Sequence, residues 1–182
     1  MGFGDTKITI NASYHAREWL TSNLVMYQID QYSQAFINQS SIDGYNIQDL
    51  LSKVSIYYVP MVNPDGVTLN QLGAGGFSNK NELIKMNNGS SDFSAWKANA
   101  RGLNLNRQYP SGWRTINNNV RSPSYAFYKG VRPFSKSETK ALYDFTLSHD
   151  FKTYVAYHSS GEIYIGRITL VQNATPIVKS LI

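Results

Sequence analysis

The sequence of 182 residues contains no cysteine and only three histidines. The absence of cysteine excludes a disulfide framework and any metal site built from thiolates. A metal ion would therefore need histidine and carboxylate ligands. Only His15, His149 and His158 can supply the imidazoles, so the sequence allows few combinations of metal ligands.

Long hydrophobic runs and clusters of basic residues are also absent. No stretch approaches the roughly 20 apolar residues that cross a bilayer, so we predict no membrane span, and no signal peptide is recognisable. The net charge of +5 comes from 17 basic and 12 acidic residues, without a basic run or a nucleic-acid-binding motif. We therefore expect no nucleic-acid partner. Thirteen tyrosines and many asparagines favour an extracellular or cell-wall protein.

The hydrophobic pattern predicts strands that alternate with helices. Period-2 and continuous apolar runs indicate strands, whereas apolar residues at three- and four-residue spacing indicate helices. The predicted strands cover residues 7–12, 54–61 and 153–157, and the predicted helices cover residues 18–36, 47–53 and 135–148. This order indicates one α/β domain with a mixed, largely parallel sheet flanked by helices.

Two local signals mark the ends of these elements. Asn63-Pro64-Asp65-Gly66 has the composition of a tight turn. Ser135-Lys136-Ser137-Glu138 has the spacing of a capping box, in which Ser135 and Glu138 would cap a helix. Residues 67–134 between them are rich in Asn, Gly and Ser, and we predict a long irregular segment there, which is often functional.

His15, Glu18 and His158 are the candidate metal ligands. His15 and Glu18 lie three residues apart where a predicted strand turns into a helix, and His158 follows another predicted strand. Zinc sites without cysteine typically use two histidines and one carboxylate, with water in the fourth position. Ligands gather at the carboxyl ends of strands in open α/β sheets. The alternative is a surface histidine beside a solvated glutamate. We interpret His149, near a helix end, as structural.

Five segments resemble the zinc carboxypeptidase family. In chain order they are Asn11–Trp19, Val59–Gly66, Asn99–Arg107, Gly130–Ser135 with Glu138, and Tyr157–Glu162. The Tyr157–Glu162 segment is most similar to that of bacterial γ-D-glutamyl-L-diamino acid peptidases, which cut peptidoglycan peptides. The resemblance covers roughly residues 5–165 and implies a family fold with one zinc ion held by His15, Glu18 and His158.

The resemblance also implies roles for residues around the ion. Arg17 would lie near the scissile carbonyl and stabilise developing negative charge. Arg101 could polarise the same carbonyl, although the spacing to Asn106 is short, and surface charge is the alternative. Asn106 and Arg107 match the pair that holds the terminal carboxylate of a substrate, a task that suits the planar guanidinium.

The sequence departs from the family pattern in three places. Asn104 stands where the family usually has an aspartate that accepts a hydrogen bond from the first histidine ligand, and this change could weaken metal affinity about 10–100-fold. Residues 164–182 do not resemble the family's continuation, and the glutamate that serves the family as general base is expected beyond Ile182. We therefore interpret residues 1–182 as a partial zinc peptidase domain whose exposed strand edges favour self-association.

These observations predict a zinc-dependent metallopeptidase that cuts a peptide bond near a free carboxylate, with a γ-D-glutamyl-diaminopimelate bond of peptidoglycan peptides as one candidate. Such a protein would be bacterial and secreted, wall-associated or spore-associated. One alternative is a non-catalytic zinc- or peptide-binding relative. Another is a zinc deacylase or amidase on the same scaffold, although the pair Asn106 and Arg107 favours peptides.

Overall fold

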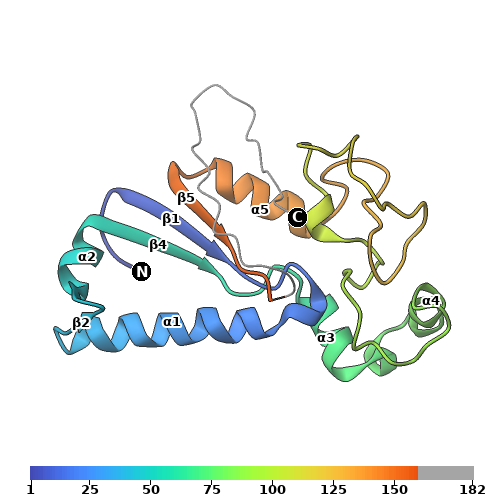
Figure 1. Cartoon of the computed structure of the whole chain (residues 1–182), viewed down its shortest axis with the longest axis horizontal. Helices are drawn as coiled ribbons and strands as arrows, with labels where there is room; N and C mark the ends of the chain where they lie inside the picture. Colours follow the sequence, from blue (N-terminus) through green and yellow to red (C-terminus); the bar gives the residue numbers. More distant parts are fainter. Residues whose placement is uncertain (160–182) are drawn as a thin grey trace.

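The computed structural model describes residues 1–159, which form a three-stranded parallel sheet with helices on both faces (Figure 1). The strands are β1 (Thr6–Asn11), β4 (Val54–Val59) and β5 (Phe151–Ala156), in the order β4-β1-β5. Both outer strands run parallel to β1. The prediction of an α/β fold with a parallel sheet flanked by helices is therefore confirmed.

The alternating side chains of the strands pack against helices on opposite faces of the sheet. On one face, Ile10 and Ile56 share a core with residues of α1 (Leu20–Ile37) and α2 (Ile47–Lys53). On the other face, Tyr57 and Phe151 contact Phe145 of α5 (Ser137–Leu147). Figure 1 shows α1 and α5 on either side of the strands. This burial of both faces explains the apolar runs in the strands.

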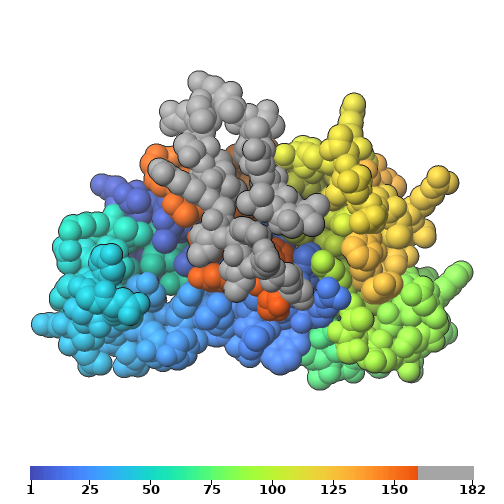
Figure 2. Space-filling model, viewed as in Figure 1, coloured from blue at the N-terminus to red at the C-terminus, as the bar shows by residue number. Residues whose placement is uncertain are grey.

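Short elements fill the rest of the chain. They are η1 (Ala16–Glu18), the strands β2 (Ser41–Ile42) and β3 (Tyr45–Asn46), α3 (Pro64–Leu72), η2 (Ala74–Gly76), α4 (Lys80–Met86) and η3 (Leu105–Arg107). A second apolar cluster around the fully buried Trp96 joins α3 and α4 to η1. Figure 2 shows this region, coloured green to yellow, beside the half that carries α1 and α2.

The predicted turn at residues 63–66 is wrong, because Asn63 starts helix α3. The side-chain Oδ1 of Asn63 accepts a hydrogen bond from the backbone N–H of Gly66 at 3.2 Å. Pro64 then occupies the first turn of the helix, where its missing N–H has no cost. Asparagine and proline serve turns and helix starts equally well, so composition alone could not separate the two.

The predicted capping box at residues 135–138 is also wrong. Helix α5 begins at Ser137, and Lys136 precedes it without a side-chain cap. The hydroxyl of Ser135 instead donates to Oε1 of Gln108 at 2.7 Å, and Glu138 accepts a hydrogen bond from Asn99 at 2.8 Å. Both side chains therefore tie the irregular segment to the helix instead of closing the helix end.

The chain's own N-terminal residues partly cover one sheet edge. Backbone groups of Met1 and Ile56 exchange hydrogen bonds of 2.8 and 2.7 Å on the outer side of β4. Self-association through strand edges stays a prediction that size-exclusion chromatography can check. None of the helices in residues 1–159 is long and apolar enough to cross a membrane.

We expect replacement of Asn63 by alanine to destabilise the chain more than replacement of a simple helix cap. Besides capping α3, the buried Asn63 donates to the carbonyls of Tyr14 and Ala98, both at 3.2 Å. Its loss would leave buried groups unpaired and cost about 2–4 kcal/mol. Asn46→Ala is the matched control, because Asn46 caps α2 through one exposed hydrogen bond and its loss should cost about 1 kcal/mol. Urea unfolding measures the loss of stability in each variant. Equal losses would contradict the additional buried role of Asn63.

Candidate metal centre

The ends of two adjacent parallel strands bring the predicted metal ligands together. Strand β1 leads to His15 and Glu18, and β5 leads to His158, with Asn11 and Ala156 paired side by side at the strand ends. A left-handed backbone at Ser13, with φ of 51°, turns the chain after β1. The strand order therefore explains how residues 140 positions apart in sequence come to lie in contact.

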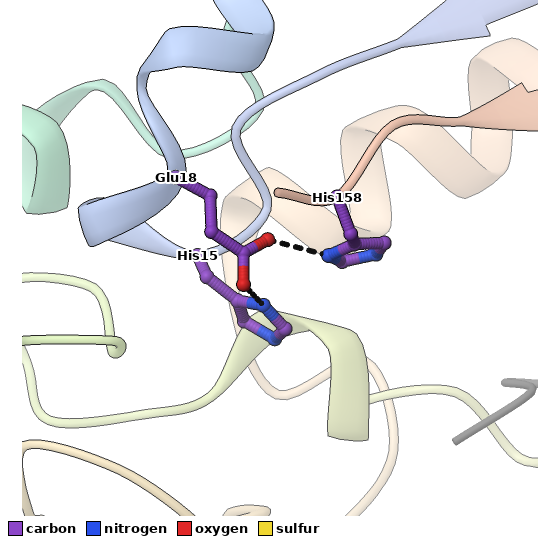
Figure 3. Close-up of side chains that lie close together, drawn as sticks. All are labelled: His15, Glu18 and His158. Carbon is purple, nitrogen blue, oxygen red and sulfur yellow. Dashed lines mark hydrogen bonds and ion pairs between the residues drawn. The ribbon is translucent and has the colours of Figure 1, made fainter. Parts of the chain in front are cut away.

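The carboxylate of Glu18 lies between the two imidazoles (Figure 3). Its Oε1 is 2.9 Å from Nδ1 of His15, and its Oε2 is 2.7 Å from Nδ1 of His158. The candidate ligand atoms of the three residues lie within 4.8 Å of one another. His15 and Glu18 are buried, whereas His158 is partly exposed. The group is therefore anchored in the protein and open towards solvent on the side of His158.

Burial and hydrogen bonding set the charge of this group. Burial lowers the pKa of His15 to about 4, although its hydrogen bond to Glu18 acts in the opposite direction, so this imidazole is neutral near pH 7. Burial alone would raise the pKa of Glu18, but its hydrogen bonds to His15 and His158 hold that pKa well below its usual range. Glu18 is therefore a buried anion beside the neutral imidazole of His15.

These residues fit a zinc ion. A buried carboxylate is costly without a positive partner, and neutral imidazole with carboxylate is a donor set that zinc prefers. Bond lengths of about 2.1 Å in a tetrahedral site separate ligand atoms by roughly 3.4 Å. The separations of 2.7 and 2.9 Å between Glu18 and the two imidazoles are shorter than that value, whereas the ligand atoms of the whole group lie within 4.8 Å of one another. Small side-chain adjustments would open the group around one divalent ion.

Three linked tyrosines adjoin His158 through the ring of Tyr14. The ring of Tyr14 stacks against His158, with centroids 5.8 Å apart. The Tyr14 hydroxyl is hydrogen-bonded to that of Tyr154 in β5 and accepts a hydrogen bond of 3.4 Å from Tyr109, which follows η3. This trio connects a metal ligand to the segment that carries Arg107. No sequence pattern predicts this trio, because the three tyrosines come from separate segments.

Lys97, which the sequence analysis did not single out, lies beside the metal-ligating turn. Its carbonyl accepts a hydrogen bond of 3.3 Å from the backbone N–H of Ala16. Burial lowers the pKa of the Lys97 ammonium, Glu18 raises it, and Arg17 and Arg107 lower it further. Lys97 is therefore within electrostatic reach of a metal ligand. A single lysine in an irregular stretch carries no signal that could have revealed this place.

Arg17 and Arg101 lie in different surroundings. Arg17 is exposed on η1, one residue before the ligand Glu18. Arg101 is exposed at the tip of a turn, and its side chain forms no hydrogen bond or ion pair within residues 1–159. Oδ1 of Asn99 accepts from the backbone N–H groups of Arg101 and Leu103, both at 3.0 Å, and so fixes this turn. The structure thus brings Arg17, but not Arg101, next to the metal-ligating group.

The predicted anchor residues lie on one helical turn. Asn106 and Arg107 belong to η3, which Asn104 immediately precedes. Arg107 is partly buried and donates from Nη1 to the carbonyl of Asn117 at 2.9 Å. Oδ1 of the buried Asn104 has no hydrogen-bond partner within the described residues, so the bond to a histidine ligand that the resemblance implies is not formed. The role predicted for Asn104 stays a prediction.

His149 lies outside the metal-ligating group. Its Nδ1 is 2.9 Å from the carbonyl of Phe145 near the end of α5, and its ring stacks on Phe151 with centroids 5.1 Å apart. These contacts are structural, as the sequence analysis predicted. Among residues 1–159, the candidate metal ligands that cluster are His15, Glu18 and His158.

Comparisons with known proteins agree with this geometry. The family described as zinc carboxypeptidase matches residues 3–170. The "Gamma-D-glutamyl-L-diamino acid endopeptidase 1" of Lysinibacillus sphaericus is 38% identical over 165 residues, which are 90% of this chain and 42% of that protein. Human mast cell carboxypeptidase A is 26% identical over 162 residues, which are 87% of this chain and 34% of that protein.

Solved structures share the fold at lower identity. Bovine thrombin-activatable fibrinolysis inhibitor, solved with a tick carboxypeptidase inhibitor, has a TM-score of 0.59 at 21% identity, over 86% of this chain and 47% of that chain. Carboxypeptidase A of Helicoverpa armigera has a TM-score of 0.61 at 22% identity, over 86% and 34%. The chain spans less than half the length of each of these four proteins.

We expect the chain to bind one zinc ion through the clustered residues. His15→Ala, Glu18→Ala and His158→Ala should each abolish stoichiometric zinc binding, because each removes one of three protein ligands. His149→Ala is the matched control and should keep the full zinc content, since His149 lies outside the group. Zinc is measured by atomic emission after dialysis against a low zinc concentration. Full zinc content in His15→Ala would refute the ligand assignment.

We also expect the tyrosine trio to make stability fall at alkaline pH. Burial raises the pKa of Tyr109 to about 12, and the pKa values of Tyr14 and Tyr154 also lie well above the usual range, mainly through burial. A raised pKa in the folded state gives stability that is present below pH 10 and lost as the pH rises towards 12. The loss for Tyr109 is about 1–2 kcal/mol at pH 11.

The free energy of unfolding, measured with urea at pH 9 and at pH 11, tests this dependence. These two pH values lie on either side of the unperturbed tyrosine pKa of roughly 10. Between these pH values, Tyr109→Phe should lose less stability than the unchanged chain. The variant lacks one hydroxyl whose pKa differs between the folded and unfolded states. Tyr27→Phe is the control, since Tyr27 is exposed on α1 and should not alter the slope. Equal slopes for Tyr109→Phe and the unchanged chain would contradict the assignment.

Proposed function

This chain belongs to the zinc carboxypeptidase family, and we propose that it forms the part of a zinc-dependent peptidase that holds the metal ion and anchors a substrate carboxylate. The observation that carries the proposal is the buried Glu18 carboxylate between two imidazoles from separate strand ends. A divalent ion bound there would offset the charge of the buried carboxylate, and all three side chains could serve as its ligands.

The residues around the group support peptide hydrolysis. Zinc bound there would supply a Lewis acid that polarises a carbonyl and lowers the pKa of water. Arg17, adjacent to Glu18, would stabilise negative charge that develops on the scissile carbonyl oxygen. Asn106 and Arg107 would hold the terminal carboxylate through charge-assisted hydrogen bonds. The chain would thus contribute metal binding, charge stabilisation and substrate orientation.

We propose peptides with a γ-D-glutamyl bond to a diamino acid as the substrate class. Support comes from the relative in Lysinibacillus sphaericus, whose name states this specificity and which is 38% identical over 90% of the chain. Bonds of this class occur in the stem peptides of bacterial peptidoglycan. The proposed place of action is therefore the cell wall or the spore of a bacterium.

Binding without hydrolysis is the second candidate function. Within residues 1–159, the metal-ligating group contains one carboxylate, Glu18, and that carboxylate is itself a ligand. A general base contributes about 10²–10⁴-fold to such reactions, and the group as described offers no second carboxylate for that task. A chain that binds zinc and peptide but releases no product would have this second function.

We expect the zinc-loaded chain to release lysine from L-Ala-γ-D-Glu-L-Lys. Chelation should abolish the release and added zinc should restore it, whereas the α-linked isomer should be a poor substrate. Arg107→Met should raise KM about 10–100-fold with a smaller effect on kcat, because it removes a charge-assisted carboxylate contact. Lysine is quantified by chromatography, with His149→Ala as the unaffected control. Zinc-dependent peptide binding without lysine release would favour the second function, and absence of binding would exclude both.

A further inference from the structure

Lys97 lies within electrostatic range of Glu18 and of two further cations, Arg17 and Arg107. The three cations come from separate segments of the chain. Burial is the largest cause that lowers the pKa of the Lys97 ammonium. Glu18 raises this pKa, and the two arginines lower it. The proposed function gives roles to Arg17 and Arg107. Lys97 is a third positive charge at the same site, and the mechanism above does not use it.

Lys97 and Arg107 flank the same aromatic ring. Nζ of Lys97 lies 6.0 Å from the centroid of Phe127, and Cζ of Arg107 lies 5.0 Å from it. Phe127 holds this position with a left-handed φ of 68°, a conformation that is costly for a bulky residue. Both cations thus contact one ring, within about the 6 Å range over which a cation interacts with a ring face.

The ammonium group of Lys97 has no anionic partner in the part of the chain that the structure describes. Within residues 1–159 it forms no hydrogen bond or ion pair, although the residue is partly buried. The exposed pairs Lys53–Asp49 and Lys140–Asp144 show that this chain pairs lysines with carboxylates elsewhere. Glu18 attracts Lys97 only at longer range, without an ion pair. A partly buried cation without a direct ion pair provides a binding position for an external anion.

The chemistry of a γ-glutamyl substrate supplies such an anion. Linkage through the γ-carboxyl group leaves the α-carboxylate of the same glutamate free, on the acyl side of the scissile amide. The diamino acid carries the second carboxylate, on the other side of that amide. One substrate therefore presents two carboxylates that flank the bond, and two neighbouring cations match this pattern better than one.

We propose that Lys97 binds the free α-carboxylate of a γ-linked glutamyl residue while Arg107 binds the carboxylate of the residue that follows. This inference rests on the function proposed above. It makes Lys97 a residue that determines specificity for acidic, γ-linked peptides. The backbone of Lys97 is hydrogen-bonded to Ala16, in the turn that carries the candidate metal ligands. The proposal therefore places the acyl side of the scissile amide next to this turn.

Isothermal titration calorimetry of the zinc-loaded chain tests this inference with two peptides. The first is L-Ala-γ-D-Glu-L-Lys, and the second carries an α-carboxamide in place of the glutamyl α-carboxylate. The unchanged chain should bind the acid about tenfold or more tightly than the amide, because a hydrogen bond to a charged group is lost with the amide. Lys97→Met should bind both peptides equally, and Lys97→Arg should keep the preference for the acid.

Two controls separate this inference from the proposed function. Arg101→Met should keep the preference of the unchanged chain, because Arg101 is an exposed cation of the same segment. Arg107→Met should weaken both peptides by the same factor. If Lys97→Met keeps the preference, or weakens acid and amide alike, Lys97 does not bind the α-carboxylate and only this inference fails. If the unchanged chain binds neither peptide, the proposed function fails with it.

Discussion

The structure of the functional region depends on one interaction, the contact of the buried Glu18 carboxylate with two imidazoles. Glu18 is fully buried, and its partners follow different strands that lie next to each other in the sheet. A buried carboxylate is tolerated only where hydrogen bonds and positive charge compensate for its lost hydration. The parallel pairing of β1 with β5 is what delivers that compensation, because it places His158 opposite the turn after β1.

Rigid elements hold this contact from several directions. Asn63, at the start of α3, binds the carbonyl of Tyr14, and Tyr14 in turn stacks against His158. The hydroxyl of Ser13 binds that of Ser22 at 2.7 Å and fixes the turn to the first helix. Each of these residues acts through packing or hydrogen bonds and not through the ion. The candidate metal ligands are therefore preorganised by the fold, which would reduce the free energy that metal binding must supply.

The sequence predicted the helices and strands that have a periodic hydrophobic pattern. The predictions failed where the hydrogen bonds of a single side chain determine the local structure. The strands β1 and β4 and the helix α2 have strong periodicity, and their predicted bounds agree with the structure to within two residues. The candidate ligands His15, Glu18 and His158 were predicted from their positions after strand ends, and the structure brings them together. By contrast, Asn63 caps a helix where its composition predicted a turn. Such choices depend on tertiary contacts that local composition does not contain.

The irregular segment between α3 and α5 shows the same limit for the substrate side. Here the hydrogen bonds from the backbone of Arg101 to Asn99 and from Ser135 to Gln108 hold the loop conformation. Arg101 matched the motif but lies at an exposed tip, whereas Lys97 matched none and lies beside the ion site. Loop conformation, not the order of motifs, therefore decides the positions of charge.

The cluster of cations has a consequence for how metal and substrate binding depend on each other. Arg17, Lys97 and Arg107 repel a divalent ion as they repel one another, so Glu18 is the main negative charge that offsets this repulsion within residues 1–159. A substrate that brings two carboxylates would neutralise two of the cations and so favour the ion. By thermodynamic reciprocity, the ion must favour the acidic substrate to the same extent. The same charges that select the substrate would therefore couple its binding to zinc.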